Sequence, residues 1–306
     1  MSAVRSFEQA EERVFARYGV PCEARFVELA DPRLRGRVLE RGEGRPLVLV
    51  AGDGAVTGAW APLLAELPGR RLILLDRPSF GLGDAFDYHR VDLRRHGVAV
   101  LRSLLDALEL DHAPLVGSSG GGQWSLWLAA AAPERVSAVA AMGIPAVCLP
   151  GFRPDAGMRA LSIPGVGQAM FKLPSPSPKA TGRMLSSADA HLPAHPEIVE
   201  LYHASRGLPA FGRSAAAIFQ RSMRPGGRPR PEWVFTDEEL ARIAVPTLFV
   251  WGDHEPYGPV DVARRAAEVM SDARVEVIAG GWHHPWLADA PAAGRALREF
   301  LAAHDA

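Results

Sequence analysis

Short, mainly apolar segments recur along the chain, and most are followed by a stretch in which apolar residues return every three or four positions. The first pattern is typical of a strand buried on both faces, and the second of an amphipathic helix. We interpret six segments as such strands: residues 46–50, 71–76, 114–117, 136–142, 246–251 and 274–279. Their alternation with helices predicts an α/β fold, a mostly parallel twisted sheet flanked by helices.

The chain before these strands has a different pattern. Apolar residues at helical spacing predict an amphipathic helix over residues 6–18. Residues 22–29 and 36–42 predict two strands, which the turn signal Asp31-Pro32 separates. This part of the chain is therefore expected to add one helix and two strands to the fold.

The alternation stops after residue 143 and resumes with residues 246–251. The segment between holds many of the prolines and has mixed helical signals. We therefore predict an α/β core of residues 1–143 and 232–306, and an inserted helical lid of residues 144–231. The larger apolar side chains of the lid form either its own core or the lining of an apolar pocket: Phe152, Met158, Met170, Phe171, Phe211 and Trp233.

Composition narrows the classes of partner. The 306 residues carry a net charge of −1, so no overall field favours nucleic acid or an anionic membrane. No segment approaches the roughly 20 apolar residues of a membrane span, and the first 20 residues lack the apolar run of a secretory signal. We expect a cytoplasmic protein that acts on a small molecule, with no nucleic-acid or membrane partner.

Metal and cofactor chemistry have little support in the sequence. Cys22 and Cys148 are far apart and make no metal-ligand or redox pattern. His191, His195 and His203 lack a regular ligand spacing with carboxylates, which favours surface or lid positions for them. The sequence thus predicts a protein with neither a metal nor a cofactor.

A run of glycine and serine follows the strand at residues 114–117. Gly117-Ser118-Ser119-Gly120-Gly121 matches G-x-S-x-G, a sharp strand-to-helix turn that presents a nucleophilic serine. The glycines two residues before and after the nucleophile avoid collisions with neighbouring backbone. Only Ser119 has glycine at both positions, because Val116 lies two residues before Ser118. The pattern therefore favours Ser119 as a nucleophile.

Several dispersed motifs, in the correct order, resemble the α/β-hydrolase family over residues 37–301. They are "RVLERGEGRPLVLVAGDG", "LLDRPSFGLGD", "VGSSGG", "VPTLFVWGDHEPYGP" and "GGWHHPWLADAPAAGRALREFL". The resemblance implies a serine–histidine–acid triad in the chain order serine, acid, histidine. It also implies that the segment at residues 144–231 is the lid of this family.

The same resemblance assigns the other members of the triad. The family pattern H-x-P-x-L places the base at His283, with His284 as a partly exposed loop residue or a neighbour that faces the substrate. The acid is expected three residues after Gly252, at Glu255, because Asp253 lies too close to the strand end.

The tetrahedral intermediate of such a reaction needs two backbone donors. We expect them to be the N–H groups of Gly120 and Asp53. The carboxylate of Asp53 should point away from the developing oxyanion, or Asp53 merely caps the following turn.

These residues predict a serine hydrolase that cleaves a small to medium, largely apolar carboxylic ester or lactone through an acyl-enzyme on Ser119. A carbon–carbon bond hydrolase, a thioesterase, or a cofactor-free haloperoxidase or perhydrolase could use the same triad. An alternative of another class is a ligand-binding protein that retains the hydrolase shell.

Overall fold

The computed structural model describes residues 2–172 and 175–304. Eight strands form one sheet in the order β1-β2-β4-β3-β5-β6-β7-β8. The strands are β1 (Glu23–Leu29), β2 (Leu34–Arg41), β3 (Arg45–Val50), β4 (Arg70–Asp76), β5 (Ala113–Ser118), β6 (Val136–Met142), β7 (Thr247–Gly252) and β8 (Ala273–Ile278). Only β2 pairs antiparallel, with β1 and with β4, and all other pairs are parallel. The predicted α/β fold is confirmed.

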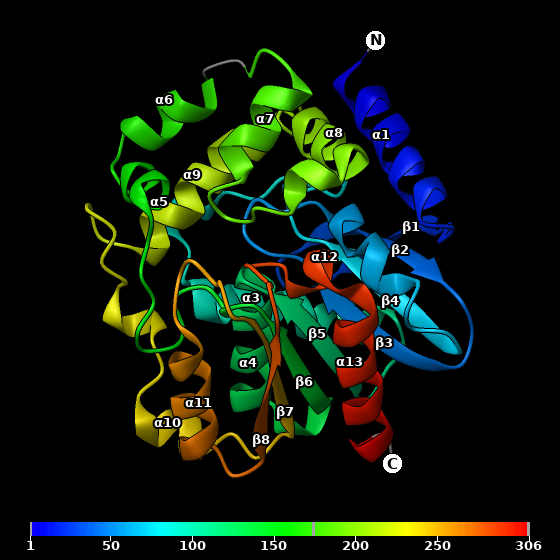
Figure 1. The fold of residues 1–306 in the computed structure, drawn as a ribbon, viewed down its shortest axis with the longest axis vertical. Coiled ribbons are helices and arrows are strands. Elements are labelled where there is room, and N and C mark those ends of the chain that lie inside the picture. Colours follow the sequence, from blue (N-terminus) through cyan, green and yellow to red (C-terminus); the bar gives the residue numbers. More distant parts are fainter. Residues whose placement is uncertain (1, 173–174, 305–306) are drawn as a thin grey trace.

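The central strands are buried on both faces, as their unbroken apolar sequences require. Every residue of β5 and β7 is buried, whereas the edge strands β1 and β8 are largely exposed. The helices α2 (Ala61–Leu64) and α13 (Ala290–His304) pack together on one face of the sheet (Figure 1). The helices α3 (Leu93–Ala107) and α4 (Gly120–Ala131) pack together on the other, where α11 (Val260–Val269) contacts β7 and β8.

Residues 144–231, hereafter the helical insertion, contribute no strand to the sheet among their described residues. Their helices are α5 (Ala156–Leu161), α6 (Val166–Lys172), α7 (Pro178–Leu185), α8 (Pro196–Ser205) and α9 (Phe211–Ser222). Figure 1 shows these helices gathered above the sheet. Leu173 and Pro174, within the proline-rich part of the insertion, lie outside the described residues.

The amphipathic helix α1 (Ala3–Arg17) joins the two parts of the molecule. It lies beside α8 of the insertion (Figure 1), where Arg13 pairs with Glu200 at 3.0 Å. On its other side Glu11 makes a buried ion pair with Arg37 of β2, at 2.5 Å. Phe7 and Val14 are fully buried between these contacts, because one face of the helix carries all its large apolar residues.

Four helical regions differ from the sequence pattern. Apolar spacing predicts one helix over residues 59–67, but the structure has a 3₁₀ turn, Thr57–Trp60, followed by the short α2. In the insertion, the helical signals around residues 158–170, 181–190 and 196–202 leave out α9, although Phe211, Ala215 and Ile218 recur at helical spacing and are buried.

Outside the insertion, two short helices were also not predicted. They are α10 (Asp237–Ala241), which Thr236 and Glu239 begin with a reciprocal capping box, and the single turn α12 (Pro285–Ala288).

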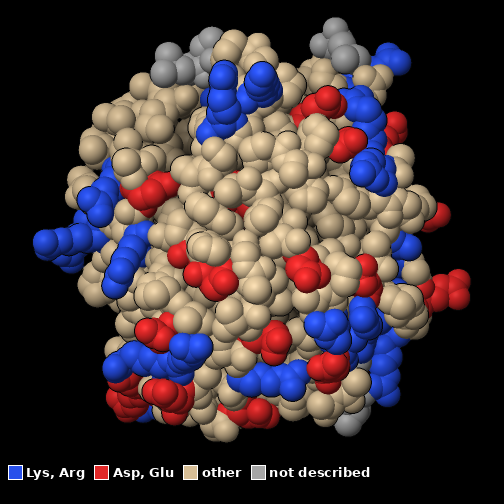
Figure 2. Space-filling view, in the orientation of Figure 1, with Lys and Arg blue, Asp and Glu red and all other residues tan. Residues whose placement is uncertain are grey.

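The surface carries charges of both signs. Figure 2 shows acidic and basic side chains interspersed over α10, α11 and α13, so this face presents no field of a single sign. Within the part of the chain that the structure describes, no helix combines the length and apolar character needed to cross a membrane.

Candidate active site

Ser119 lies in the sharp turn between β5 and α4. Its φ of 49° and ψ of −120° are unusual for a residue with a side chain, and such strain is concentrated at functional sites. A Cβ atom on Gly121 would lie 2.0 Å from the carbonyl oxygen of Val50, so this turn requires glycine there. Ser119 lines a cavity, described below, whereas Ser118 is buried at the end of β5 and is not among the described lining residues.

His283 and Glu255 form a buried pair beside this turn. Nδ1 of His283 lies 2.9 Å from Oε2 and 3.1 Å from Oε1 of Glu255. The backbone N–H groups of Ile144 and Tyr257 donate to the same carboxylate, at 3.0 and 3.2 Å. The side chains are 7% and 0% exposed, so the pair is held in one geometry away from water.

The environment of His283 favours its protonated form. Burial acts to lower the pKa of His283, but the charge of Glu255 and its hydrogen bond raise it, and the charge of Asp189 adds to this. The net result is a pKa above the usual value of a histidine. A carboxylate that favours imidazolium in this way is what a general base needs as it takes up a proton.

Asp253, the competing acid, lies away from this pair. Its carboxylate contacts His254 at 3.0 Å, and both side chains are exposed. The loop after β7 therefore turns Glu255 inward and leaves Asp253 at the surface.

The loop after β3 brings Asp53 next to the turn. Gly52 packs against Ser119, and a Cβ atom on Gly120 would lie 2.5 Å from the Asp53 carboxylate. The prediction that this carboxylate points away from the turn is wrong. It lies over Gly120 and pairs with Arg77 at 2.7 Å. Arg77 offsets the negative charge, which explains how an acidic side chain is tolerated here.

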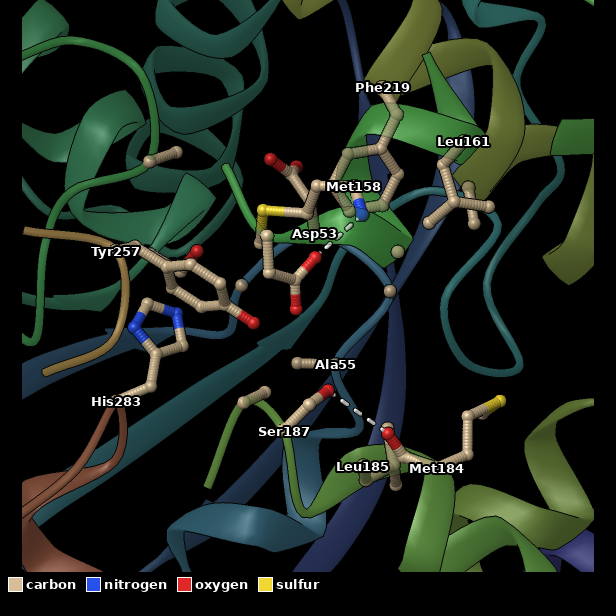
Figure 3. A pocket seen from close by; sticks show the side chains of 18 of the residues that line it. Asp53, Ala55, Met158, Leu161, Met184, Leu185, Ser187, Phe219, Tyr257 and His283 are labelled. Atoms are coloured by element: carbon tan, nitrogen blue, oxygen red, sulfur yellow. Dashed lines mark hydrogen bonds between the residues drawn. The ribbon is translucent and has the colours of Figure 1, made fainter. Parts of the chain in front are cut away.

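A cavity of about 250 Å³ lies between the turn and the insertion. Figure 3 shows Met158, Leu161 and Phe219 on one side of it, Met184 and Leu185 on another, and His283 beside Tyr257. The cavity is thus mostly apolar, with Ser119, His283, His284 and Asp53 among its polar groups. Of the six large apolar residues predicted to form the lid core or line a pocket, five line this cavity. The sixth, Trp233, lies just after the insertion and packs against Trp127 instead.

His284 has its own carboxylate, which the sequence did not reveal. Its Nδ1 lies 3.2 Å from Oδ2 of Asp189, and its backbone N–H donates to the same oxygen at 2.8 Å. The other oxygen of Asp189 accepts from the backbone N–H of His191 at 2.9 Å. His284 is therefore a buried residue of the cavity wall rather than a partly exposed loop residue.

Two further histidines of the insertion contact the segment around His283. Nε2 of His191 lies 2.9 Å from the carbonyl oxygen of Gly280, and Nε2 of His195 lies 3.1 Å from that of Leu287. His203 instead contacts Thr181. Together with Asp189, His191 and His195 attach the insertion to the loop that carries both cavity histidines.

Comparison with known proteins identifies the family of this chain. The family described as alpha/beta hydrolase fold matches residues 45–289, most of the chain. The chain therefore belongs to the α/β-hydrolase fold family. This membership agrees with the resemblance seen in the motifs.

Among curated α/β-hydrolases, the chain is 29% identical to 2-hydroxy-6-oxo-2,4-heptadienoate hydrolase of Pseudomonas putida, over 86% of this chain and 91% of that protein. It is 28% identical to 2-hydroxymuconate semialdehyde hydrolase of a Pseudomonas species, over 91% and 94%. Among solved structures, carboxylesterase CesB from Bacillus subtilis superposes with a TM-score of 0.76 at 21% identity, covering 98% of this chain and 99% of that chain. That likeness shows the fold alone.

Proposed function

We propose that this α/β-hydrolase is a serine hydrolase that cleaves a small to medium, largely apolar carboxylic ester or lactone. The observation that carries the proposal is the convergence of three features on one apolar cavity. These are the strained Ser119, the buried pair of His283 and Glu255, and the loop of Asp53. A nucleophile, its base and an acid that orients the base are the parts that acyl transfer through serine requires.

Each residue has a distinct part in the proposed reaction. The Ser119 hydroxyl attacks the carbonyl carbon while Nε2 of His283 takes its proton. Glu255 keeps Nδ1 of His283 as a donor, so that Nε2 is the nitrogen free to accept. The N–H groups of Gly120 and Asp53 stabilise the oxyanion. His283 then protonates the leaving oxygen, and water releases the acyl group by the same steps in reverse.

We assign the helical insertion the role of a lid that selects the substrate. It supplies most of the apolar side chains of the cavity, whereas the core supplies Ser119, His283 and Glu255. Methionines such as Met158 and Met184 are flexible and fill irregular spaces, which suits acyl chains of varied shape.

A second candidate is cleavage of a carbon–carbon bond next to a ketone. The curated relatives are named as hydrolases of 2-hydroxy-6-oxo-dienoates and of a muconate semialdehyde, which are carboxylates. Arg206 is the one lysine or arginine among the described residues that line the cavity, where it lies 5.7 Å from the ring centre of Phe171. A guanidinium in an apolar cavity suits a carboxylate at the far end of such a substrate.

One panel of substrates separates these candidates. Aryl esters of increasing acyl length and lactones test the first, and 2-hydroxy-6-oxo-dienoates, followed by their loss of absorbance, test the second. Turnover of esters with no turnover of the dienoates supports the first candidate. A dienoate preference that Arg206→Gln lowers far more than Arg206→Lys supports the second.

Labelling with a fluorophosphonate tests the binding-protein alternative. A competent triad gives rapid labelling of the wild-type protein, which Ser119→Ala abolishes. Poor labelling of the wild-type protein, with no turnover of the panel, would instead favour a protein that only binds its ligand.

A further inference from the structure

The side chain of Asp53 is not used by the proposed reaction, which needs only its backbone N–H. Yet the side chain of Asp53 lines the same cavity as Ser119 (Figure 3 shows Asp53). Its carboxylate packs against Gly120. The side chain is 11% exposed, and Arg77 is its one ion-pair partner among the described residues. The carboxylate thus presents an acceptor to a mostly apolar space.

The position of this carboxylate is built into the core rather than incidental. Arg77 is 2% exposed and stacks on the ring of Trp124, with its guanidinium carbon 3.8 Å from the ring centre. Its Nη1 lies 2.7 Å from Oδ1 of Asp53. Because Arg77 is fixed by burial and stacking, it holds Oδ1 of Asp53, whose side chain is one of those that line the cavity.

A carboxylate oxygen at the wall of an apolar cavity raises the free energy of the complex when ligand binding removes its water, unless the ligand donates a hydrogen bond to it. Among the described residues, Oδ2 of Asp53 has no hydrogen-bond donor, and the nearby cavity wall is mostly apolar. A substrate that fills the cavity removes water from this oxygen, and an unpaired acceptor then opposes binding. A substrate with a donor at this point gains a charge-assisted hydrogen bond instead.

We propose that Asp53 is a recognition site for a hydroxyl group close to the reacting carbonyl of the substrate. This assignment rests on the proposed function, because attack by Ser119 is what places the carbonyl beside Gly120. Arg77 neutralises the charge of Asp53, so the site favours a neutral donor over an ammonium group. The substrate class is thereby narrowed to hydroxyacyl esters or hydroxyacyl lactones.

The test measures binding of unreactive amides by calorimetry, so it does not depend on turnover. The amides are of hexanoic acid, with hydroxyl, methoxy, ammonium or hydrogen at carbon 2 or carbon 3. The wild-type protein should bind a hydroxy amide at least about tenfold more tightly than its methoxy partner, the size expected of one hydrogen bond to a charged group.

Asp53→Asn is the decisive variant. Arg77 requires an oxygen, so the amide NH₂ of the new side chain turns to the cavity and donates equally to hydroxyl and methoxy oxygens. The hydroxy-to-methoxy ratio should therefore fall to about 1. Asp155→Asn is the matched control, because Asp155 lines the same cavity and Asn preserves its capping of α5, so the ratio should stay at its wild-type value.

Three outcomes would overturn the assignment: no preference in the wild-type protein, a preference that survives in Asp53→Asn, or tighter binding of the ammonium compound. If Asp53→Asn does not fold, Asp53→Glu replaces it; there the extra methylene displaces the carboxylate and should remove the preference.

Fluorophosphonate labelling of Ser119, run in parallel, separates the two proposals. Labelling without a hydroxyl preference refutes only the hydroxyl site. A preference without labelling refutes the proposed hydrolase and leaves Asp53 as the hydroxyl site of a protein that only binds its ligand.

Discussion

Two adjacent histidines face the same cavity, and each is paired with a carboxylate from a different part of the molecule. His283 is held by Glu255, which follows the core strand β7, and His284 is held by Asp189 of the helical insertion. The rings of the two histidines are in contact, with their centres 5.2 Å apart. The two pairs look alike in composition, but they differ in what positions them.

The difference supports the proposal that His283 and Glu255, rather than His284 and Asp189, take part in catalysis. Glu255 follows β7, and its carboxylate accepts from Tyr257 of the same loop and from Ile144, two residues after the end of β6, so groups beside the sheet orient His283. Asp189 belongs to the insertion, and its contact with His284 joins the insertion to the loop after β8; we call this contact the clasp. A histidine and a carboxylate side by side do not define a catalytic pair unless both are fixed to the element that carries the nucleophile.

The largest effect should come from removing Ser119, the proposed nucleophile. Ser119→Ala should lower kcat by roughly 10⁴ to 10⁶, because the acyl-enzyme cannot form. Ser118→Ala is the matched control and should keep substantial activity. Steady-state kinetics with an aryl ester measures both, and an inactive Ser118→Ala beside an active Ser119→Ala would reverse our assignment.

The next largest effect should come from Glu255, and it can be compared directly with that of Asp189. Glu255→Gln should lower kcat by about 10⁴, because the amide no longer favours the correct tautomer and imidazolium form of His283. Asp189→Asn should lower it by less than about tenfold, and Asp253→Asn should have little effect because Asp253 is exposed. An equal loss in Asp189→Asn and Glu255→Gln would show that the insertion takes part in the chemistry.

Asp189 should matter more for the stability of the protein than for kcat. It accepts two backbone hydrogen bonds as well as contacting His284, so Asp189→Asn should lower the free energy of unfolding by about 1–3 kcal/mol. Urea unfolding measures the loss, and hydrogen exchange should show faster exchange in residues 185–205.

The loss of unfolding free energy in Asp189→Asn should depend on pH. The pKa of Asp189 is lowered, since contacts with His284 and backbone N–H groups outweigh the opposing effect of burial. Its contribution is therefore present above the unfolded pKa and is lost as the pH falls through the lower folded pKa. The difference between wild type and Asp189→Asn should shrink below about pH 4. A difference that grows on acidification would contradict the clasp.

The smallest effect should be that of the Asp189 charge on the pKa of His283. As the proposed base, His283 must be neutral to accept a proton. Because its pKa is raised, kcat/KM should fall on the acid side with an apparent pKa above about 6.5. Asp189 contributes to that rise, so Asp189→Asn should move the acid limb slightly to lower pH. A shift to higher pH would mean that Asp189 does not act on His283 through its charge.

The sequence predicts the sheet and the register of Ser119 because both depend on short-range patterns. Burial on two faces gives unbroken apolar strands, and the backbone crowding at Gly121 demands glycine near the nucleophile. The preference for Glu255 over Asp253 depended on the family resemblance, and the loop does bring Glu255 to His283.

The clasp and the ion pair of Asp53 could not be predicted in the same way. Asp189 and His284 are 95 positions apart, and no local pattern distinguishes Asp189 from a solvated aspartate. Asp53 and Arg77 meet only because the loops after the neighbouring strands β3 and β4 lie at the same sheet edge. The capping box of α10, in contrast, was a local signal that could have been recognised.

The position of α1 has a consequence for how the chain folds as it is synthesised. Arg13 and its partner Glu200 are 187 positions apart, so α1 leaves the ribosome well before α8 exists. Until then, the apolar face that carries Phe7 and Val14 lacks the part of its binding surface that α8 provides. We expect α1 to dock late, and chaperones that recognise exposed amphipathic helices to have their main opportunity on this nascent chain before α8 emerges.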